Sequence, residues 1–319
     1  MPTSKLEEET VLAMIFDSVR PAEVGEGATR NSDDAYVELS HFFSQAGIAV
    51  PKLLFDGRNE GILLVEDLGD ILLGEVLLGN GGPGYETVSS EELYRLAIAQ
   101  SIHLQQIPKQ VGFFPFERRF NVDLYEREMS EFSEFFLPPF APSTREISCC
   151  QEFFAYLANE VANLEYALCH RDYHSWNLMV DAEGALRIID FQDALMAPKL
   201  YDLVALLNDR DTDQALGEEL YHRLLEHYRV SASYGPEFYF DYYRVLLQRD
   251  LKVVGRFAKL VSVRKLPLYG RWIPGTFARV RRGLTELGAL NPNIPPVALE
   301  FQRILERIQP NVERGAQSQ

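Results

Sequence analysis

Three oxygen-bearing side chains, Asp172, Asn177 and Asp190, follow one another at intervals that could build a reaction centre. Two short apolar runs, Leu178–Val180 and Leu186–Ile189, are separated by a polar turn that contains glycine. This pattern predicts a β-hairpin. Folding the hairpin brings Asn177 and Asp190 opposite each other at its open end, and leaves Asp172 on the loop that enters it.

The three residue types suit phosphoryl transfer. Magnesium prefers oxygen ligands and usually takes only one or two from the protein, so Asn177 and Asp190 are the candidate metal ligands. Asp172 can orient an attacking hydroxyl and accept its proton. The reaction needs mainly positioning and charge neutralisation. The same three residues could instead belong to a capped turn and a strand end with no catalytic role. Their joint spacing favours a reaction centre.

Two histidines flank Asp172. His170 and His174 are four residues apart, which is the spacing of a zinc pair on a helix, but this segment is expected to be a loop. We therefore expect His170 to pack and hydrogen-bond under the loop. The three cysteines are too few and too irregularly spaced for a zinc site or a disulfide framework.

The preceding segments predict a small sheet. Thr10–Phe16 is apolar and indicates a buried strand, and Ser32 or Asp33 could cap a helix that Gly47 ends. Lys52–Phe55 and Ile62–Val65 are short apolar runs on either side of a turn, which is typical of a hairpin.

The remainder is predicted to be mainly helical. Ser89 and Ser143 each begin a capping-box pattern, and the first of these helices should run towards Gln106. Glu237–Val261 has the pattern of one long helix, whose aromatic residues we expect in the core. A sheet-containing part at residues 1–66 should therefore precede a helical part at residues 67–319.

Composition limits the classes of function. The 319 residues carry a net charge of −16, which argues against a nucleic-acid partner and fits either an acidic, soluble surface or a cationic substrate. No apolar run is long enough to span a membrane, and the acidic N-terminus is unlike a signal peptide. We expect a cytoplasmic protein, a monomer or weak dimer, without a membrane partner.

A resemblance to a known family follows from the catalytic-loop residues. His170-Arg171-Asp172, then four residues and Asn177, matches the kinase catalytic-loop pattern, and His174 follows as in the aminoglycoside phosphotransferase/choline kinase superfamily. The segment resembles that superfamily over about half of the chain. The likeness implies an α+β, protein-kinase-like bilobal fold, with a small and apparently truncated N-terminal sheet lobe.

The resemblance also implies roles for individual residues. It makes Asp172 the catalytic base and Asn177 and Asp190 the Mg²⁺ ligands, with ATP as co-substrate. His170, Arg171, His174 and Asp202 would support the catalytic loop. A plain helix cap is the alternative role for Asp202, which begins an apolar helix.

Within the superfamily, one branch is most similar. Gln192-Asp193 and the segment around Arg249 resemble the bacterial anomeric N-acetylmuramate/N-acetylglucosamine kinases of cell-wall recycling. The resemblance implies a small-molecule acceptor phosphorylated at its anomeric hydroxyl. Asp193 could then accept a hydrogen bond from the sugar, and Arg249 could pair with the lactyl carboxylate. Trp176 stands where that branch is expected to have arginine.

Nucleotide binding has less support in the sequence. Glu66, Asp67 and Leu68 follow an apolar strand, where kinase-like proteins bind adenine through the backbone. Gly79–Gly84 formally matches a phosphate-binding loop but lacks the strand and helix that should frame it. Gly25–Gly27 is expected to be an ordinary solvated loop.

Two expected features of a kinase N-terminal lobe are missing. Val11–Phe16 contains no lysine, and no strand pair with a phosphate-covering turn precedes it. Either the chain is truncated, or other groups bind phosphate. An aminoglycoside or choline/ethanolamine kinase is therefore an alternative, and a catalytically weak pseudokinase or nucleotide-binding regulatory protein is a second one.

Overall fold

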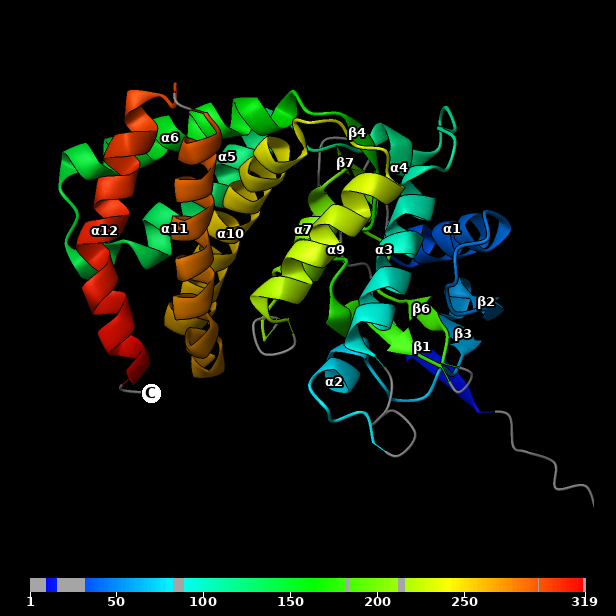
Figure 1. The fold of residues 1–319 in the computed structure, drawn as a ribbon. Coiled ribbons are helices and arrows are strands. Elements are labelled where there is room, and N and C mark those ends of the chain that lie inside the picture. The colour runs from blue at the N-terminus through cyan, green and yellow to red at the C-terminus, as the bar shows by residue number, and fades with distance from the viewer. Residues whose placement is uncertain are drawn as a thin grey trace, which may run out of the picture.

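The computed structural model shows a small sheet region on one side and a larger helical region on the other (Figure 1). It describes residues 10–15, 32–82, 89–181, 184–211, 216–291 and 293–317. The predicted loop at Gly25–Gly27 lies outside the described residues. The predicted order, a sheet followed by mainly helical structure with one embedded hairpin, is confirmed.

The first sheet has three antiparallel strands in the order β1-β3-β2. They are β1 (Val11–Ile15), β2 (Leu53–Gly57) and β3 (Ile62–Glu66), and the predicted hairpin is the β2–β3 pair. Helix α1 (Ser32–Gln45) packs beside it and ends just before Gly47, whose φ of 76° needs the left-handed region that glycine tolerates.

The prediction that the first strand is buried is wrong. Val11, Leu12 and Ile15 are 51%, 55% and 78% exposed. The reason is the position of β1 at the edge of the sheet, paired only with β3 among the described strands. An apolar run predicts a strand, but neighbouring elements decide whether that strand is covered.

Two further strand pairs frame the candidate catalytic loop. Strand β4 (Tyr166–Cys169) pairs with β7 (Leu195–Pro198), and β5 (Leu178–Val180) pairs with β6 (Leu186–Ile188). The β5–β6 register joins Leu178 to Ile188, as the predicted hairpin requires. The loop from His170 to Asn177 therefore runs from the end of β4 to the start of β5.

The helices that make up the rest of the described chain are α2 (Leu73–Leu77), α3 (Ser90–Gln105), α4 (Phe114–Glu117), α5 (Val122–Glu131), α6 (Thr144–Ala162), α7 (Tyr201–Leu207), α9 (Glu218–Ser231), α10 (Phe238–Ser262), α11 (Ile273–Leu290) and α12 (Pro296–Gln317). The long helix α10 packs against α5, α6, α7 and α11. Its residues Phe238, Tyr242 and Tyr243 are buried, as predicted, whereas Tyr239 and Phe240 are only partly buried. No helix in these ranges is both long and apolar enough to cross a membrane.

The two predicted capping boxes have different outcomes. The one at α6 forms, since the Ser143 N–H donates to Glu146 Oε2 at 2.8 Å and the Glu146 N–H donates to Ser143 Oγ at 3.3 Å. The one at α3 does not form, because the Ser89 side chain accepts no cap bond. Glu91, which precedes the box position Glu92, pairs with Arg95.

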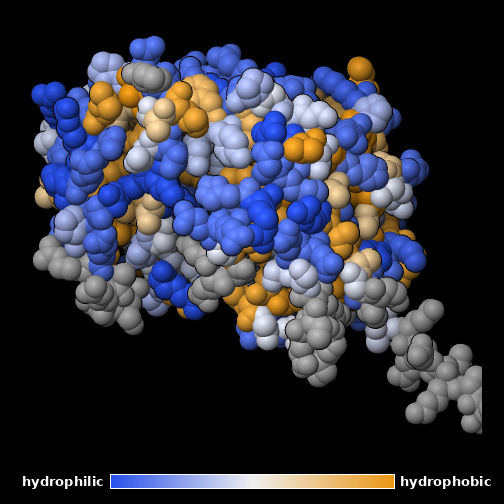
Figure 2. All heavy atoms as spheres, in the orientation of Figure 1, coloured by the Kyte–Doolittle hydropathy of each residue, from blue (hydrophilic) through white to orange (hydrophobic). Residues whose placement is uncertain are grey.

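A single apolar core joins the sheet region to the helices. Tyr36 of α1 stacks on Phe191 at 4.8 Å between ring centroids, and Phe43 meets the same ring edge-on at 5.6 Å. Helix α1 therefore anchors the residue that follows Asp190. Hydrophilic residues cover most of the face seen in Figure 2, with hydrophobic patches among them.

Candidate active site

The start of the candidate catalytic loop is fixed by Asp202. Its Oδ2 accepts the His170 backbone N–H at 2.7 Å, and its Oδ1 accepts that of Arg171 at 3.0 Å. Asp202 is fully buried in the first turn of α7, and burial raises its pKa to about 6. The N-cap of α7 is Leu200 and no side chain caps the helix, so the alternative role of Asp202 as a helix cap is wrong.

His170 connects this loop to the strand that leads to Asp190. The buried imidazole places Nε2 2.9 Å from the carbonyl oxygen of Ile189. Arg171 has a φ of 81°, a conformation that costs energy for a residue other than glycine. The surrounding contacts must hold it, and one of them is Arg171 Nη2 to Glu128 Oε1 at 3.7 Å.

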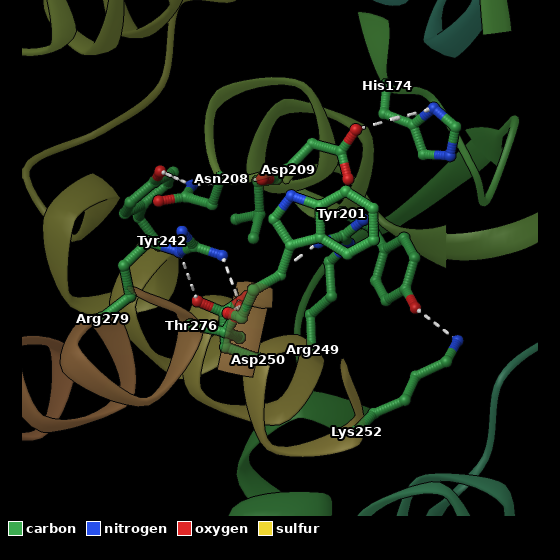
Figure 3. Close-up of polar contacts among 12 residues, drawn as sticks. His174, Tyr201, Asn208, Asp209, Tyr242, Arg249, Asp250, Lys252, Thr276 and Arg279 are labelled. Carbon is green, nitrogen blue, oxygen red and sulfur yellow. Dashed lines mark hydrogen bonds and ion pairs between the residues drawn. The ribbon is translucent and has the colours of Figure 1, made fainter. Parts of the chain in front are cut away.

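Asp172 lies half-buried in a cationic environment. Burial alone would raise the pKa of Asp172, but the positive charges of Lys252 and Arg171 outweigh it and hold the pKa below its ordinary value. Lys252 Nζ lies 2.9 Å from Glu128 Oε1 and 3.4 Å from the Tyr201 hydroxyl, the second contact being drawn in Figure 3. Asp172 is therefore ionised at neutral pH.

Lys252 is not among the site residues predicted from the sequence. It lies on the buried side of α10, more than 70 residues after the loop in sequence. A lysine at a core-facing position of a helix pattern is a signal that could have found it, because buried lysines need a partner.

Asn177 precedes β5 and Asp190 follows its partner strand β6, and the Ile189 N–H donates to the Asn177 carbonyl at 3.1 Å. Asn177 Nδ2 donates to the Asp172 carbonyl at 2.9 Å, which leaves its amide oxygen to face a ligand. Asp190 is exposed, with a φ of 60°, and its Oδ1 accepts a bond from Gln192 Nε2 at 2.7 Å.

This donor set fits magnesium. One amide oxygen and one carboxylate are what a magnesium ion shared with phosphates takes from a protein. Within the described residues, no three His, Cys, Asp or Glu side chains gather to hold a metal by themselves. A metal at this hairpin would take its other ligands from phosphate and water.

The other predicted site residues have partners of their own. Asp193 Oδ1 lies 3.2 Å from Arg118 Nη2, and the buried Arg249 lies 3.9 Å from Asp250. His174 Nδ1 lies 3.9 Å from Asp209 Oδ2 (Figure 3). None of Gln192, Asp193 and Arg249 lines the cavity that adjoins the catalytic loop at Trp176.

The segment expected to bind adenine follows β3. Glu66 accepts hydrogen bonds from Arg187 Nη2 at 2.6 Å and from the Lys52 N–H at 3.0 Å. Asp67 Oδ1 accepts the Gly69 N–H at 2.9 Å. These contacts fix the path of the chain through Leu68. The Gly79–Gly84 motif extends beyond the described residues.

A cavity of about 600 Å³ adjoins the catalytic loop at Trp176. Its other lining residues come from the segments after α2 and α7, from the 3-10 helix Pro267–Trp272 and from α11: Leu78, Asn80, Arg210, Asp211, Arg271, Trp272, Gly275, Thr276 and Arg279. Three arginines face one aspartate. Sequence reasoning missed this cavity because its residues come from separate segments without a shared motif.

The fold and the loop together define a small-molecule kinase of protein-kinase-like architecture. A family model described as "Phosphotransferase enzyme family" matches residues 21–244, and the chain belongs to that family. The predicted superfamily and the predicted α+β kinase-like fold are confirmed.

Curated relatives carry a more specific name. The chain is 27% identical over 278 residues to the N-acetylmuramate/N-acetylglucosamine kinase of Pseudomonas aeruginosa, which covers 82% of this chain and 78% of the relative. It is 28% identical over 269 residues to the Neisseria meningitidis protein of the same name, with 80% and 77% covered.

Solved structures agree in fold. The choline kinase LicA from Streptococcus pneumoniae superposes with a TM-score of 0.55 at 15% identity, covering 89% of this chain and 88% of that one. The ADP-bound aminoglycoside phosphotransferase APH(2'')-Ib gives 0.52 at 12% identity, covering 77% and 80%.

Proposed function

We propose that the protein transfers the γ-phosphoryl group of ATP to the anomeric hydroxyl of N-acetylmuramate or N-acetylglucosamine. The observation that carries this proposal is the similarity to kinases of that name over about four fifths of the chain. The loop around Asp172 supplies the chemistry that such a transfer requires. The expected setting is the cytoplasm, where ATP is available.

Asp172 acts as the base. Its carboxylate orients the sugar hydroxyl and accepts its proton as the hydroxyl oxygen bonds to the γ-phosphorus and the bond to ADP breaks. A lowered pKa makes Asp172 a weak base. The anomeric hydroxyl is more acidic than other sugar hydroxyls, so a weak base is enough to assist it.

Asn177 and Asp190 would hold Mg²⁺, which neutralises phosphate charge when it is bound. His170, Arg171, His174 and Asp202 support the loop that carries Asp172. The backbone at Glu66, Asp67 and Leu68 binds adenine.

The cavity beside Trp176 argues against the alternative acceptors. Aminoglycosides and choline are cationic, and the three lining arginines exceed their two carboxylate partners, Asp211 and Asp250, by one positive charge, which disfavours a cation. Aromatic rings and polar groups suit a sugar instead. A pseudokinase has no need for all three of Asp172, Asn177 and Asp190, which the fold keeps around one hairpin.

The test is phosphorus NMR of the product formed from ATP and each amino sugar with magnesium. A sugar 1-phosphate is a labile glycosyl phosphate, and its signal is distinguishable from that of a 6-phosphate. Phosphorylation of an aminoglycoside or of choline, with no reaction on either amino sugar, would contradict the proposal. If the protein binds ATP but phosphorylates none of the amino sugars, aminoglycosides or choline, the pseudokinase hypothesis is favoured.

A further inference from the structure

Arg210 lies against two indole rings at the cavity beside the catalytic loop. Its guanidinium carbon is 5.3 Å from the Trp176 ring and 5.6 Å from the Trp272 ring. Trp176 directly precedes the candidate metal ligand Asn177 in the sequence, so the cavity that Arg210 lines adjoins the catalytic loop. Stacking against aromatic faces orients a guanidinium and leaves its N–H donors at the edge of the plane.

The other two arginines of the cavity already have acidic partners. Arg279 Nε donates to Asp250 Oδ2 at 3.0 Å (Figure 3), and Arg271 Nη2 lies 3.5 Å from Asp211 Oδ2. For Arg210, no carboxylate of the described residues lies within ion-pair distance, although Asp211 is its neighbour in sequence. Counting only carboxylates of the described residues, Arg210 is therefore the lining arginine whose charge is left to pair with an anionic ligand.

The wall behind Arg210 is rigid. Trp272 Nε1 donates to Asp211 Oδ1 at 2.9 Å, which fixes the indole that Arg210 contacts. Thr276 donates to the Trp272 carbonyl at 2.9 Å and accepts a bond from Arg279 Nη2 at 3.2 Å. A guanidinium held by such a wall loses little conformational freedom on binding, which favours affinity.

We propose that Arg210 is the carboxylate-binding residue of the acceptor pocket and that it selects sugars carrying an acidic substituent. This inference rests on the proposed function. N-acetylmuramate differs from N-acetylglucosamine by its lactyl group, whose carboxylate can take two parallel hydrogen bonds from one guanidinium. The sequence had suggested Arg249 for this contact, but Arg249 is buried and does not line the cavity.

The test compares steady-state kinetics of the wild type, Arg210→Gln and Arg210→Lys on the two amino sugars. A charge-assisted contact of this kind is worth about a tenfold to hundredfold change in affinity. We expect Arg210→Gln to raise KM for N-acetylmuramate at least about tenfold and KM for N-acetylglucosamine less than about threefold. Arg210→Lys should fall between, because it keeps the charge but loses the paired donors.

Arg264→Gln is the matched control, since Arg264 is exposed and outside the cavity lining; it should change neither KM. Thermal melting of each variant checks that it is folded. If the wild type phosphorylates both sugars and Arg210→Gln raises both KM values equally, the Arg210 inference is overturned and the proposed function stands.

If the wild type phosphorylates neither sugar, the proposed function is wrong, and calorimetric binding tests Arg210 separately. Glucuronate and glucose are then the paired probes. A preference for glucuronate that Arg210→Gln abolishes would support a carboxylate site, whereas equal binding of the two by the wild type would overturn it.

Discussion

Asp202 lies beneath the peptide bonds that lead into Asp172, and its Oδ2 accepts the His170 N–H at 2.7 Å. Its second oxygen binds the next N–H, that of Arg171, whose φ of 81° is unfavourable for a residue with a side chain. One buried carboxylate therefore satisfies two backbone donors and stabilises a strained turn. The position of Asp172 depends on this contact.

Asp202→Ala should destabilise the fold and impair turnover together. Two buried N–H groups would lose their acceptor, at a cost of about 1–3 kcal/mol each. We expect the free energy of unfolding in urea to fall by about 2–6 kcal/mol and kcat to fall at least about tenfold. A variant that is less stable but has wild-type kcat would show that the contact is structural alone.

Asp172→Asn should lower kcat at least about a hundredfold, because general-base and orienting effects are of that size. The amide has nearly the shape of the carboxylate but cannot accept the proton. ATP affinity, measured by calorimetry, should change little. A loss of nucleotide binding as large as the loss of kcat would contradict the role of base.

Asp190→Ala should impair nucleotide binding that depends on magnesium, because it removes the carboxylate of the proposed metal site. Titration of ATP with and without magnesium measures this effect, and binding without the metal is the internal control. The magnesium-dependent gain in affinity should shrink. If the gain persists in full, Asp190 is not a metal ligand.

Lys252→Met should move the acidic limb of the kcat–pH profile to higher pH. Lys252 and Arg171 hold the pKa of Asp172 below its ordinary value despite burial, so Asp172 stays ionised on acidification. Without Lys252 that pKa rises, and the carboxylate is protonated at a higher pH than in the wild type. Activity should therefore be lost at a higher pH than in the wild type as the solution is acidified.

The matched control for this change is Lys259→Met. Lys259 lies two turns further along α10 and pairs with Glu131 at 2.8 Å. It should lower stability without moving the pH profile. An unchanged acidic limb in Lys252→Met would show that Lys252 does not control the ionisation of Asp172.

The sequence by itself determined the local elements around the site. Two short apolar runs separated by a polar turn predicted the β5–β6 hairpin, and the positions of Asn177 and Asp190 at its open end followed directly, because a two-stranded register is a local property. Helices α6 and α10 were predicted for the same reason, because helical periodicity is also a local property of the sequence.

Tertiary structure alone decided which distant residues surround that loop. Lys252, Arg210 and Trp272 come from separate helices and connections, so no spacing in sequence brings them together. The exposure of β1 and the unformed capping box at Ser89 were likewise decided by neighbours. A local pattern fixes the conformation of a segment, whereas burial and charge pairing depend on what packs against it.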